Sequence, residues 1–213
     1  MAGAARAVSV RRLLIQHAWV PAMIGPARAV GQTRLMAGTL DWIPALDRPD
    51  LLAAPVTEAL AALGDGAASV QVAEIDPDLA DTAAFCETYG VPLDISANCV
   101  VLAAKRSGGA SGLAACLVLA TTRADVNGLA RRTLEARKAS FASMDEAVAA
   151  TGMEYGGITP IGLPPDWPLL VDAAVADADR AVVGSGVRRS KLLAPGALLA
   201  ALPRAQVLAG LGR

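Results

Sequence analysis

The chain has 213 residues, of which 54% are hydrophobic and 18% charged, so it can bury a core and is not disordered throughout. Its seven aromatic residues are too few for modules that stack bases on aromatic platforms, and no apolar run reaches the ~18 residues of a membrane span. The single histidine, His17, and three cysteines without a CxxC pair argue against a histidine-activated nucleophile and a zinc site.

The first 35 residues differ in composition from the rest of the chain. They contain five arginines and no acid, whereas residues 36–213 contain 14 basic and 20 acidic residues. Arg11 and Arg12 before a short apolar run are also features of a targeting peptide. We expect residues 1–35 to be a poorly ordered extension, or the product of a start codon upstream of a true start at Met36. The folded domain is then residues 36–213.

Helix and strand signals follow one another in no strict βαβ order. Asp76 and Ser143 are typical of helix starts, and Gly90 and Gly152 of helix ends. The sequence therefore predicts one α+β domain around a mixed, mostly antiparallel sheet with flanking helices. In chain order we expect a helix at 50–63, a strand at 70–75, a helix at 77–89, a hairpin of 98–104 and 113–120 with a flexible loop, a helix capped by Thr122 or Asp125 and ending at Glu135, a strand at 139–141, a helix at 144–151, central strands at 169–172 and 181–183, a helix at 195–202 and a strand at 206–208.

Residues 151–162 are the densest candidate for a functional site. They contain four glycines and one proline, and neither a helix nor a strand continues through such a segment. The backbone N–H groups of a glycine loop can hold a carbonyl or phosphate oxygen. A tight connection between two elements would account for the same composition equally well.

Two further segments carry candidate anion-binding features. Gly184-Ser185-Gly186 follows an apolar strand and precedes three cations in residues 188–191, which fits an anion-facing rim or, more readily, a charged turn. Residues 123–138 hold five basic and two acidic residues. This excess of positive charge fits either a polyanion-binding patch or a solvated helix face.

The order of these pieces is distinctive. A hairpin is followed by Thr151-Gly152, a Gly156-x-x-x-Pro160 loop, Gly162, a Leu-Leu-Val-Asp strand and a Gly-Ser-Gly turn. This order resembles the YbaK/prolyl-tRNA-synthetase-associated editing domain family over about residues 70–210. The resemblance implies the YbaK-like fold.

The resemblance also implies a trans-editing deacylase that hydrolyses the ester of a mischarged aminoacyl-tRNA. The partner is then the aminoacylated acceptor end of tRNA, and a ribose hydroxyl or a water attacks, so no cofactor, metal or membrane is needed. Such an activity, like three thiols that read as buried apolar groups, fits the cytoplasm. Carried over by position, the catalytic loop is Gly156, Gly157 and Pro160, and the substrate-binding residues are Ile158, Thr159, Asp172, Gly184, Ser185 and Gly186. We add Lys191 to the substrate-binding residues as a cation that could reach the pocket from another strand.

One departure from the family pattern bears on activity. The family has a lysine on the first hairpin strand, where this chain has Val100 and Val101. Lys105 is the nearest amine in sequence, and Lys191 would have to reach the pocket from another strand. The alternative function is therefore a non-catalytic module of the same fold that binds aminoacyl-tRNA or a small molecule. The sequence leaves the amino-acid specificity and the oligomeric state open.

Overall fold

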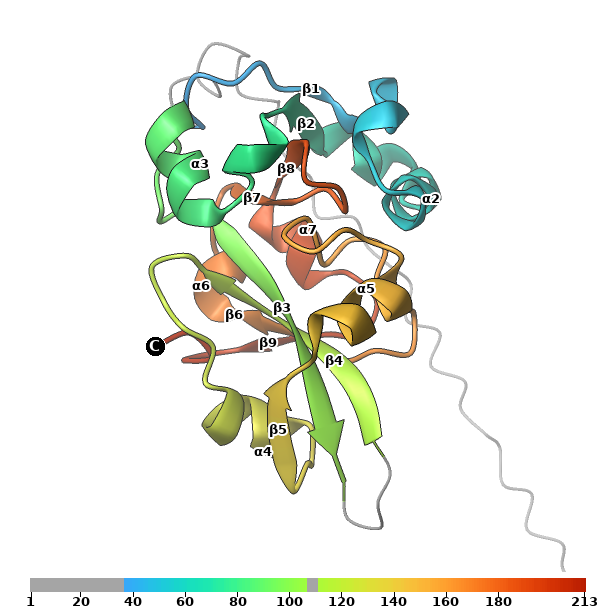
Figure 1. Ribbon diagram of the computed structural model, residues 1–213, viewed down its shortest axis with the longest axis vertical. Coiled ribbons are helices and arrows are strands. Elements are labelled where there is room, and N and C mark those ends of the chain that lie inside the picture. Colours follow the sequence, from blue (N-terminus) through green and yellow to red (C-terminus); the bar gives the residue numbers. More distant parts are fainter. Residues whose placement is uncertain (1–36, 107–110) are drawn as a thin grey trace, which may run out of the picture.

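The computed structural model describes residues 37–106 and 111–213 (Figure 1). The expected extension at residues 1–35, the proposed start at Met36 and the tip of the expected flexible loop at 107–110 lie outside the described residues. No helix in the described part of the chain is both long and apolar enough to cross a membrane.

Short helices and strands alternate along the chain. Five of the described helical segments are short stretches of 3₁₀ or π geometry, labelled η. In chain order the elements are β1 (Ile43–Pro44), η1 (Ala45–Asp47), η2 (Pro49–Leu51), α2 (Ala54–Ala62), η3 (Gly64–Ser69), β2 (Gln71–Glu74), η4 (Pro77–Leu79), α3 (Thr82–Tyr89), β3 (Ala97–Lys105), β4 (Ser111–Leu119), η5 (Val126–Ala130), α4 (Arg131–Thr133), β5 (Lys138–Phe141), α5 (Met144–Thr151), β6 (Leu169–Asp172), α6 (Ala173–Ala176), β7 (Ala181–Gly184), β8 (Ser190–Ala194), α7 (Gly196–Ala200) and β9 (Ala205–Leu208).

The strands form two sheets. The four-stranded sheet has the order β1-β2-β8-β7 and is antiparallel, and the five-stranded sheet has the order β5-β3-β4-β6-β9. In the second sheet β4, β6 and β9 are parallel, while β3 pairs antiparallel with β4 and β5. The α+β class and the mostly antiparallel pairing are confirmed, although the strands divide between two sheets. A bridge between Ser96 and Val182 connects β7 to the start of β3.

The predicted boundaries are confirmed at both ends of α5 and at the end of α3, whereas the predicted start of the second helix at Asp76 is wrong. Ser143 Oγ accepts the Glu146 amide at 3.2 Å and starts α5, and Gly152 ends it with φ of +66°. Helix α3 is preceded by a separate turn, η4, and is capped by Asp81, which accepts the Ala83 amide at 3.1 Å. It ends at Gly90 as predicted. Local side-chain–backbone bonds therefore fix these termini.

Three other predictions about elements are also wrong. The first helix begins at Ala54 rather than at residue 50, because Pro49 starts a separate 3₁₀ turn and Pro55 occupies the first turn of α2. Residues 190–194 form strand β8, although Ser190 and Lys191 made this segment resemble a charged turn. Strand β7 lies at the edge of its sheet rather than at the centre.

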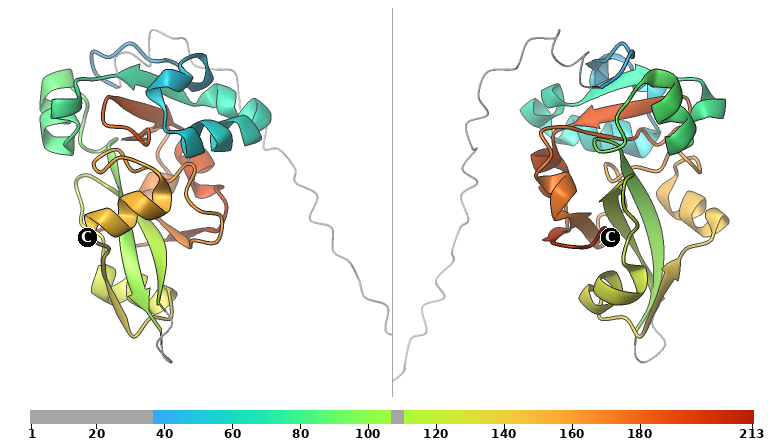
Figure 2. Two further views of the ribbon diagram at one scale, coloured as in Figure 1. Left: turned by 45° about the vertical axis from the view of Figure 1, so that its right-hand side comes forward. Right: turned by 90° about the vertical axis from the view of Figure 1, so that its left-hand side faces the viewer.

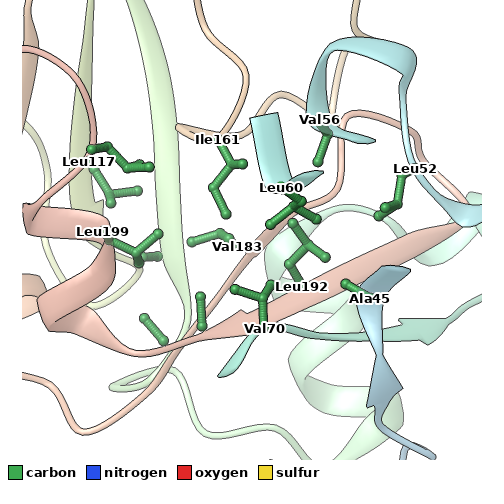
Figure 3. Packing of buried hydrophobic residues seen from close by; sticks show 14 of the residues in the cluster. Ala45, Leu52, Val56, Leu60, Val70, Leu117, Ile161, Val183, Leu192 and Leu199 are labelled. Atoms are coloured by element: carbon green, nitrogen blue, oxygen red, sulfur yellow. The ribbon is translucent and has the colours of Figure 1, made fainter. Parts of the chain in front are cut away.

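The largest hydrophobic cluster joins the two sheets. Leu117 of β4 packs with Val183 of β7 and Leu192 of β8, and Leu60 of α2 and Ile161 cover them (Figure 3). Each of these five side chains is at most 1% exposed. Burying such a side chain is worth about 1.5–3 kcal/mol, so this shared core holds the sheets together.

The β3–β4 hairpin has different neighbours on its two faces. Helices α5 and α4 lie on opposite sides of it (Figure 2). Val101 packs with Ala147 of α5 and with Trp167, whereas Leu102 packs with the cluster under η5 and α4. Successive side chains of a strand point to opposite faces, so this alternation fixes which residues of β3 face α5.

Candidate functional site

A cavity of about 750 Å³ opens between the two sheets. Its walls are α3, the first half of β3, the connection from β5 to α5, the loop after α5, and strands β7 and β8. Most of the lining is apolar, with small side chains such as Ala80, Ala97 and Ala147. The polar lining residues are Asp81, Thr82, Ser96, Asn98, Cys99, Ser143, Tyr155 and Lys191.

Lys191 brings a buried cation to this cavity. It lies on β8 and is only 7% exposed. Its Nζ donates to the Ala80 carbonyl at 2.8 Å and lies 5.3 Å from the centre of the Phe85 ring. An ammonium has three N–H donors, and among the described residues Ala80 supplies the only hydrogen-bond acceptor. Lys191 therefore retains donors that a bound oxygen could satisfy.

Burial controls the protonation of Lys191. The pKa of Lys191 is lowered to about 8, mainly because the ammonium is removed from water and to a smaller extent by the Arg188 charge, while Cys86 and the Asp81 carboxylate oppose this shift. The side chain is thus still mostly protonated at neutral pH. A partly desolvated ammonium attracts a negative or polar ligand atom more strongly than an exposed one.

The thiols near the cavity are unsuited to nucleophilic attack. Cys99 lines the cavity and Cys116 lies opposite Val100 in the neighbouring strand. Burial raises the pKa of Cys116 to about 12 and holds the pKa of the Cys99 thiol well above its usual range. Because the thiolate is the reactive form, both side chains are inert near neutral pH.

The glycine loop is held against the β7–β8 turn by backbone hydrogen bonds. The Gly157 amide donates to Glu154 O at 2.9 Å, and the Gly186 amide donates to Gly157 O at 2.8 Å. The Glu154 amide in turn donates to Gly186 O at 2.8 Å. The Gly157 amide is thus bonded within the protein, and the three bonds join the loop to the β7–β8 turn.

Close packing explains why glycines occupy both segments. A Cβ at Gly157 would lie 2.6 Å from the carbonyl carbon of Val187. One at Gly184 would lie 2.7 Å from the Ile158 carbonyl oxygen and still closer to that of Gly157. Gly184 pairs directly with Lys191 across β7 and β8, so this contact sets the loop beside the strand that carries the lysine.

The structure brings four of the ten predicted site residues together. Gly156, Ile158, Gly184 and Lys191 line the cavity. The other six lie outside the lining in the part of the chain described: Gly157, Thr159, Pro160, Asp172, Ser185 and Gly186.

Several of these six residues have structural contacts away from the cavity. Asp172 ends β6, caps α6 by accepting the Ala174 amide at 2.8 Å, and accepts the Gly212 amide. Ser185 Oγ lies 2.6 Å from Ser190 Oγ within the β7–β8 turn. Thr159 is fully buried, and its hydroxyl has no hydrogen-bond partner among the described residues.

The cations of residues 188–191 have separate roles. The Arg188 guanidinium donates to Pro77 O at 2.9 Å and to Tyr155 O at 3.3 Å. The Arg189 guanidinium donates to the Asp50 carbonyl oxygen. Both arginines thus connect loops, and of these cations only Lys191 lines the cavity.

The structure also shows what surrounds the place where the family has its lysine. Val100 and Val101 line the cavity, whereas Lys105 is exposed at the far end of β3 and is not part of the lining. Of the two lysines considered from the sequence, Lys191 is therefore the one that reaches the cavity. It enters from β8, across from the hairpin strand.

Sequence reasoning missed the α3 wall of the site. Thr82 Oγ1 donates to Asn98 Oδ1 at 2.7 Å, which joins the first turn of α3 to β3 inside the cavity. Phe141 and Tyr155 lie at its edge and are 64% and 58% exposed. Only Tyr155 lies in a segment that the sequence marks, the glycine loop at 151–162, and the other residues come near the loop only when the sheets pack together.

Known proteins share this fold. A candidate trans-editing enzyme for prolyl-tRNA synthetase has a TM-score of 0.62 and 23% identity, over 74% of this chain and 94% of that chain. Hypothetical protein APE2540 has a TM-score of 0.63 and 21% identity, over 75% and 99%. A scaffold for computational grafting of epitope backbones has a TM-score of 0.63 and 23% identity, over 74% and 95%. A comparison with curated proteins found no match.

The sequence itself carries a family match. Residues 76–202 match the family described as the aminoacyl-tRNA editing domain, and this segment spans more than half of the chain. It includes α3, the hairpin, the glycine loop and both strands that carry Gly184 and Lys191. The chain therefore belongs to the aminoacyl-tRNA editing domain family, of the YbaK type.

Proposed function

We propose that this protein hydrolyses the ester bond of mischarged aminoacyl-tRNA in the cavity between its two sheets. The observation that carries the proposal is the Lys191 ammonium, which is buried, faces the cavity and has a single acceptor among the residues that the structure describes. The cavity volume of about 750 Å³ suits an aminoacylated terminal nucleoside, because small-molecule sites span ~300–1,000 Å³.

The charge of Lys191 suits the transition state of ester hydrolysis. When an oxygen nucleophile attacks the ester carbonyl carbon, negative charge develops on the carbonyl oxygen. An N–H donor held in a largely apolar site stabilises that charge without first having to reorganise. The backbone of Gly156 and Ile158 lies along the same cavity and completes the wall around the reacting group.

The nucleophile comes from outside the protein in this proposal. Histidine is absent from the described residues, and the raised pKa values of Cys99 and Cys116 keep both thiols protonated. A water molecule, assisted by a ribose hydroxyl of the substrate, attacks the carbonyl carbon and the bond from this carbon to the ribose oxygen breaks. The ribose oxygen takes up a proton, which leaves the free amino acid and uncharged tRNA.

The test is a panel of correctly and incorrectly charged tRNAs, with release of the amino acid followed over time. We expect faster release than in buffer for at least one mischarged tRNA. Lys191→Met should lower kcat by about 10²–10³, the usual effect of removing one oxyanion donor. Circular dichroism of the variant should match the wild type. Release no faster than in buffer for every tRNA would refute hydrolysis.

Binding without hydrolysis is the second candidate function. Two observations favour it: valines occupy positions 100 and 101, and the Gly157 amide bonds to Glu154 O instead of facing the cavity. Under this alternative the wild type binds charged tRNA in a filter assay and leaves the ester intact. The same panel thus distinguishes the two functions.

A further inference from the structure

Charge is distributed unevenly along this chain. Residues 97–142 contain seven basic and two acidic residues, while the rest of 36–213 contains seven basic and eighteen acidic residues. Half of the cations thus come from about a quarter of this part of the sequence. We call these seven residues the basic end: Lys105, Arg106, Arg123, Arg131, Arg132, Arg137 and Lys138.

The fold gathers most of these cations at one end of the molecule. Six of them lie at the far end of the β3–β4 hairpin, on β5 and in or beside α4, at the opposite end of the long axis from α3 (Figure 1), whereas Arg123 pairs through its backbone with the C-terminal Arg213. Lys105 and Lys138 are directly opposite each other in the β3–β5 register, and both are exposed. Like charges in this position repel, so the sheet tolerates a cost here that a bound anion would remove.

The described residues offer the basic end little compensating negative charge, apart from the Asp125 carboxylate, whose pKa the Arg132 charge helps to lower. Across residues 37–106 and 111–213, salt bridges join Arg48 to Asp50 and Glu74, and Arg213 to Asp125, and none involves the basic end. Arg106 and Arg131 donate to backbone carbonyl groups, which leaves their charge uncompensated. Their positive field therefore extends into solvent.

The opposite rim of the cavity is acidic. Residues 76–94, which include η4 and α3, contain five carboxylates and no lysine or arginine. Asp81 belongs to this group and lines the cavity. A polyanion with its end in the cavity is repelled by this rim, and the focused positive field at the basic end attracts it.

Strand β5 connects the cavity to the basic end. Phe141 at one end of β5 lines the cavity, and Lys138 at the other end pairs with Lys105. The three steps along β5 from Phe141 to Lys138 span about 10 Å, and the four steps along β3 from Val101 to Lys105 span about 13 Å. The cations therefore begin within the reach of the phosphates next to a nucleoside held in the cavity.

We propose that the acceptor arm of the tRNA leaves the cavity over β5 and lays its phosphates on the basic end, away from α3. This inference rests on the proposed function for the identity of the polyanion. A role in protecting the edge strand would account for Lys138, because charged residues on edge strands prevent aggregation. It would not account for Arg106, Arg132 and Arg137, which flank the sheet edge.

The test is binding of uncharged tRNA, followed by fluorescence anisotropy over a series of salt concentrations. The variant Lys105→Gln/Arg137→Gln/Lys138→Gln removes three exposed charges and should fold normally. We expect its affinity at 0.1 M salt to fall by about 10- to 100-fold, and the slope of log K against log salt to fall by about 2. Arg204→Gln, an exposed charge outside the basic end, is the matched control and should bind as the wild type does.

The possible results distinguish failure of the proposed path from failure of the proposed function. Equal loss in the triple variant and in Arg204→Gln, or no loss in either, would overturn the proposed path. Binding to phosphatidylserine vesicles in place of tRNA would overturn it as well. If the wild type deacylates no tRNA but still binds tRNA through the basic end, the proposed function fails and the path stands. If deacylation occurs and KM for charged tRNA is unchanged in the triple variant, the function stands and the path fails.

Discussion

Lys191 connects burial, charge and reactivity in one side chain. Asp81, Cys86 and Arg188 are the charged or titratable groups that act on it, and desolvation is the largest influence, which brings its pKa to about 8. A proposed role as a protonated donor thus has a direct consequence for pH dependence.

We predict that the rate enhancement over buffer falls as pH rises through about 8. Above this pKa Lys191 loses its proton and no longer stabilises the developing oxyanion. Lys191→Arg should retain part of the activity and lack this decrease, because arginine stays charged throughout. Initial rates from pH 6 to 9.5, each divided by the buffer rate, measure the effect. A wild-type profile that rises through pH 8 would contradict the donor role.

Gly184 offers a second test at the residue scale. Gly184→Ala places a methyl group against the carbonyl oxygens of Gly157 and Ile158. We expect the free energy of unfolding to fall by about 1–3 kcal/mol, typical of overpacking. We also expect kcat/KM to fall roughly 10- to 100-fold as the loop moves.

Gly112→Ala is the matched control for this substitution. Gly112 also lies in a strand, has no atom within 4 Å of its potential Cβ and is exposed. Its replacement should leave activity and stability unchanged or slightly improve stability. Urea denaturation and deacylation rates compare the two variants, and equal behaviour would show that the contact with the loop is unimportant.

Among the elements, the turn formed by η5 and α4 depends most clearly on one side chain. Asp125 accepts the Leu129 amide at 2.7 Å and the Gly128 amide at 3.1 Å, and forms a salt bridge with Arg213 at 2.8 Å. The hydrogen bond from Leu129 is the main reason that the pKa of Asp125 lies below its ordinary value. The ionised carboxylate therefore stabilises the start of the segment that carries part of the basic end.

Asp125→Ala should lower the melting temperature at pH 7. A carboxyl group with a depressed pKa in the folded state stabilises the protein above its unfolded pKa of about 4, and this contribution disappears as pH falls through the folded value. The difference in melting temperature between variant and wild type should thus shrink below pH 4. Asp166→Ala, at an exposed site, is the control and should show little effect at either pH. A difference that stays constant down to pH 2 would contradict the role of the ionised cap.

At the scale of the whole molecule, the two sheets share one core. Trp42 packs with the cluster between α3 and the four-stranded sheet, whereas Trp167 packs against Val101 and Ala147 beside the five-stranded sheet. The cluster that contains Leu117 and Leu192 lies between these regions and takes residues from both sheets. Unfolding one sheet would expose the inner face of the other.

We therefore predict a single cooperative unfolding transition. Variants with Trp19 replaced by phenylalanine and either Trp42 or Trp167 kept as the only tryptophan report on the two sheets separately. Their urea midpoints by fluorescence should coincide, after correction for the stability of each variant, with those by circular dichroism. Two separated midpoints would show that the sheets unfold independently.

Much of the local structure could be predicted from the sequence alone. Ser143 and Gly152 marked both ends of α5, and alternation or apolar runs located most of the strands. These features depend on residues close in the chain, such as a cap and the amide three positions later. Strand β8 was missed because Ser190 and Lys191 are polar, and only their neighbours in the fold make them buried.

The site, too, has features that the sequence predicts and features that only the tertiary structure determines. The glycine loop and the family membership follow from the order of residues along the chain, so the chemical class could be inferred before the fold was known. The tertiary structure decided which lysine reaches the cavity, which loop residues face it, and where the charges gather. Lys191 contacts Ala80 and Phe85, and shares the cavity with Gly156, only because β8 packs beside α3 and the loop. Contacts between distant segments depend on how the sheets pack, and no local pattern in the sequence encodes that packing.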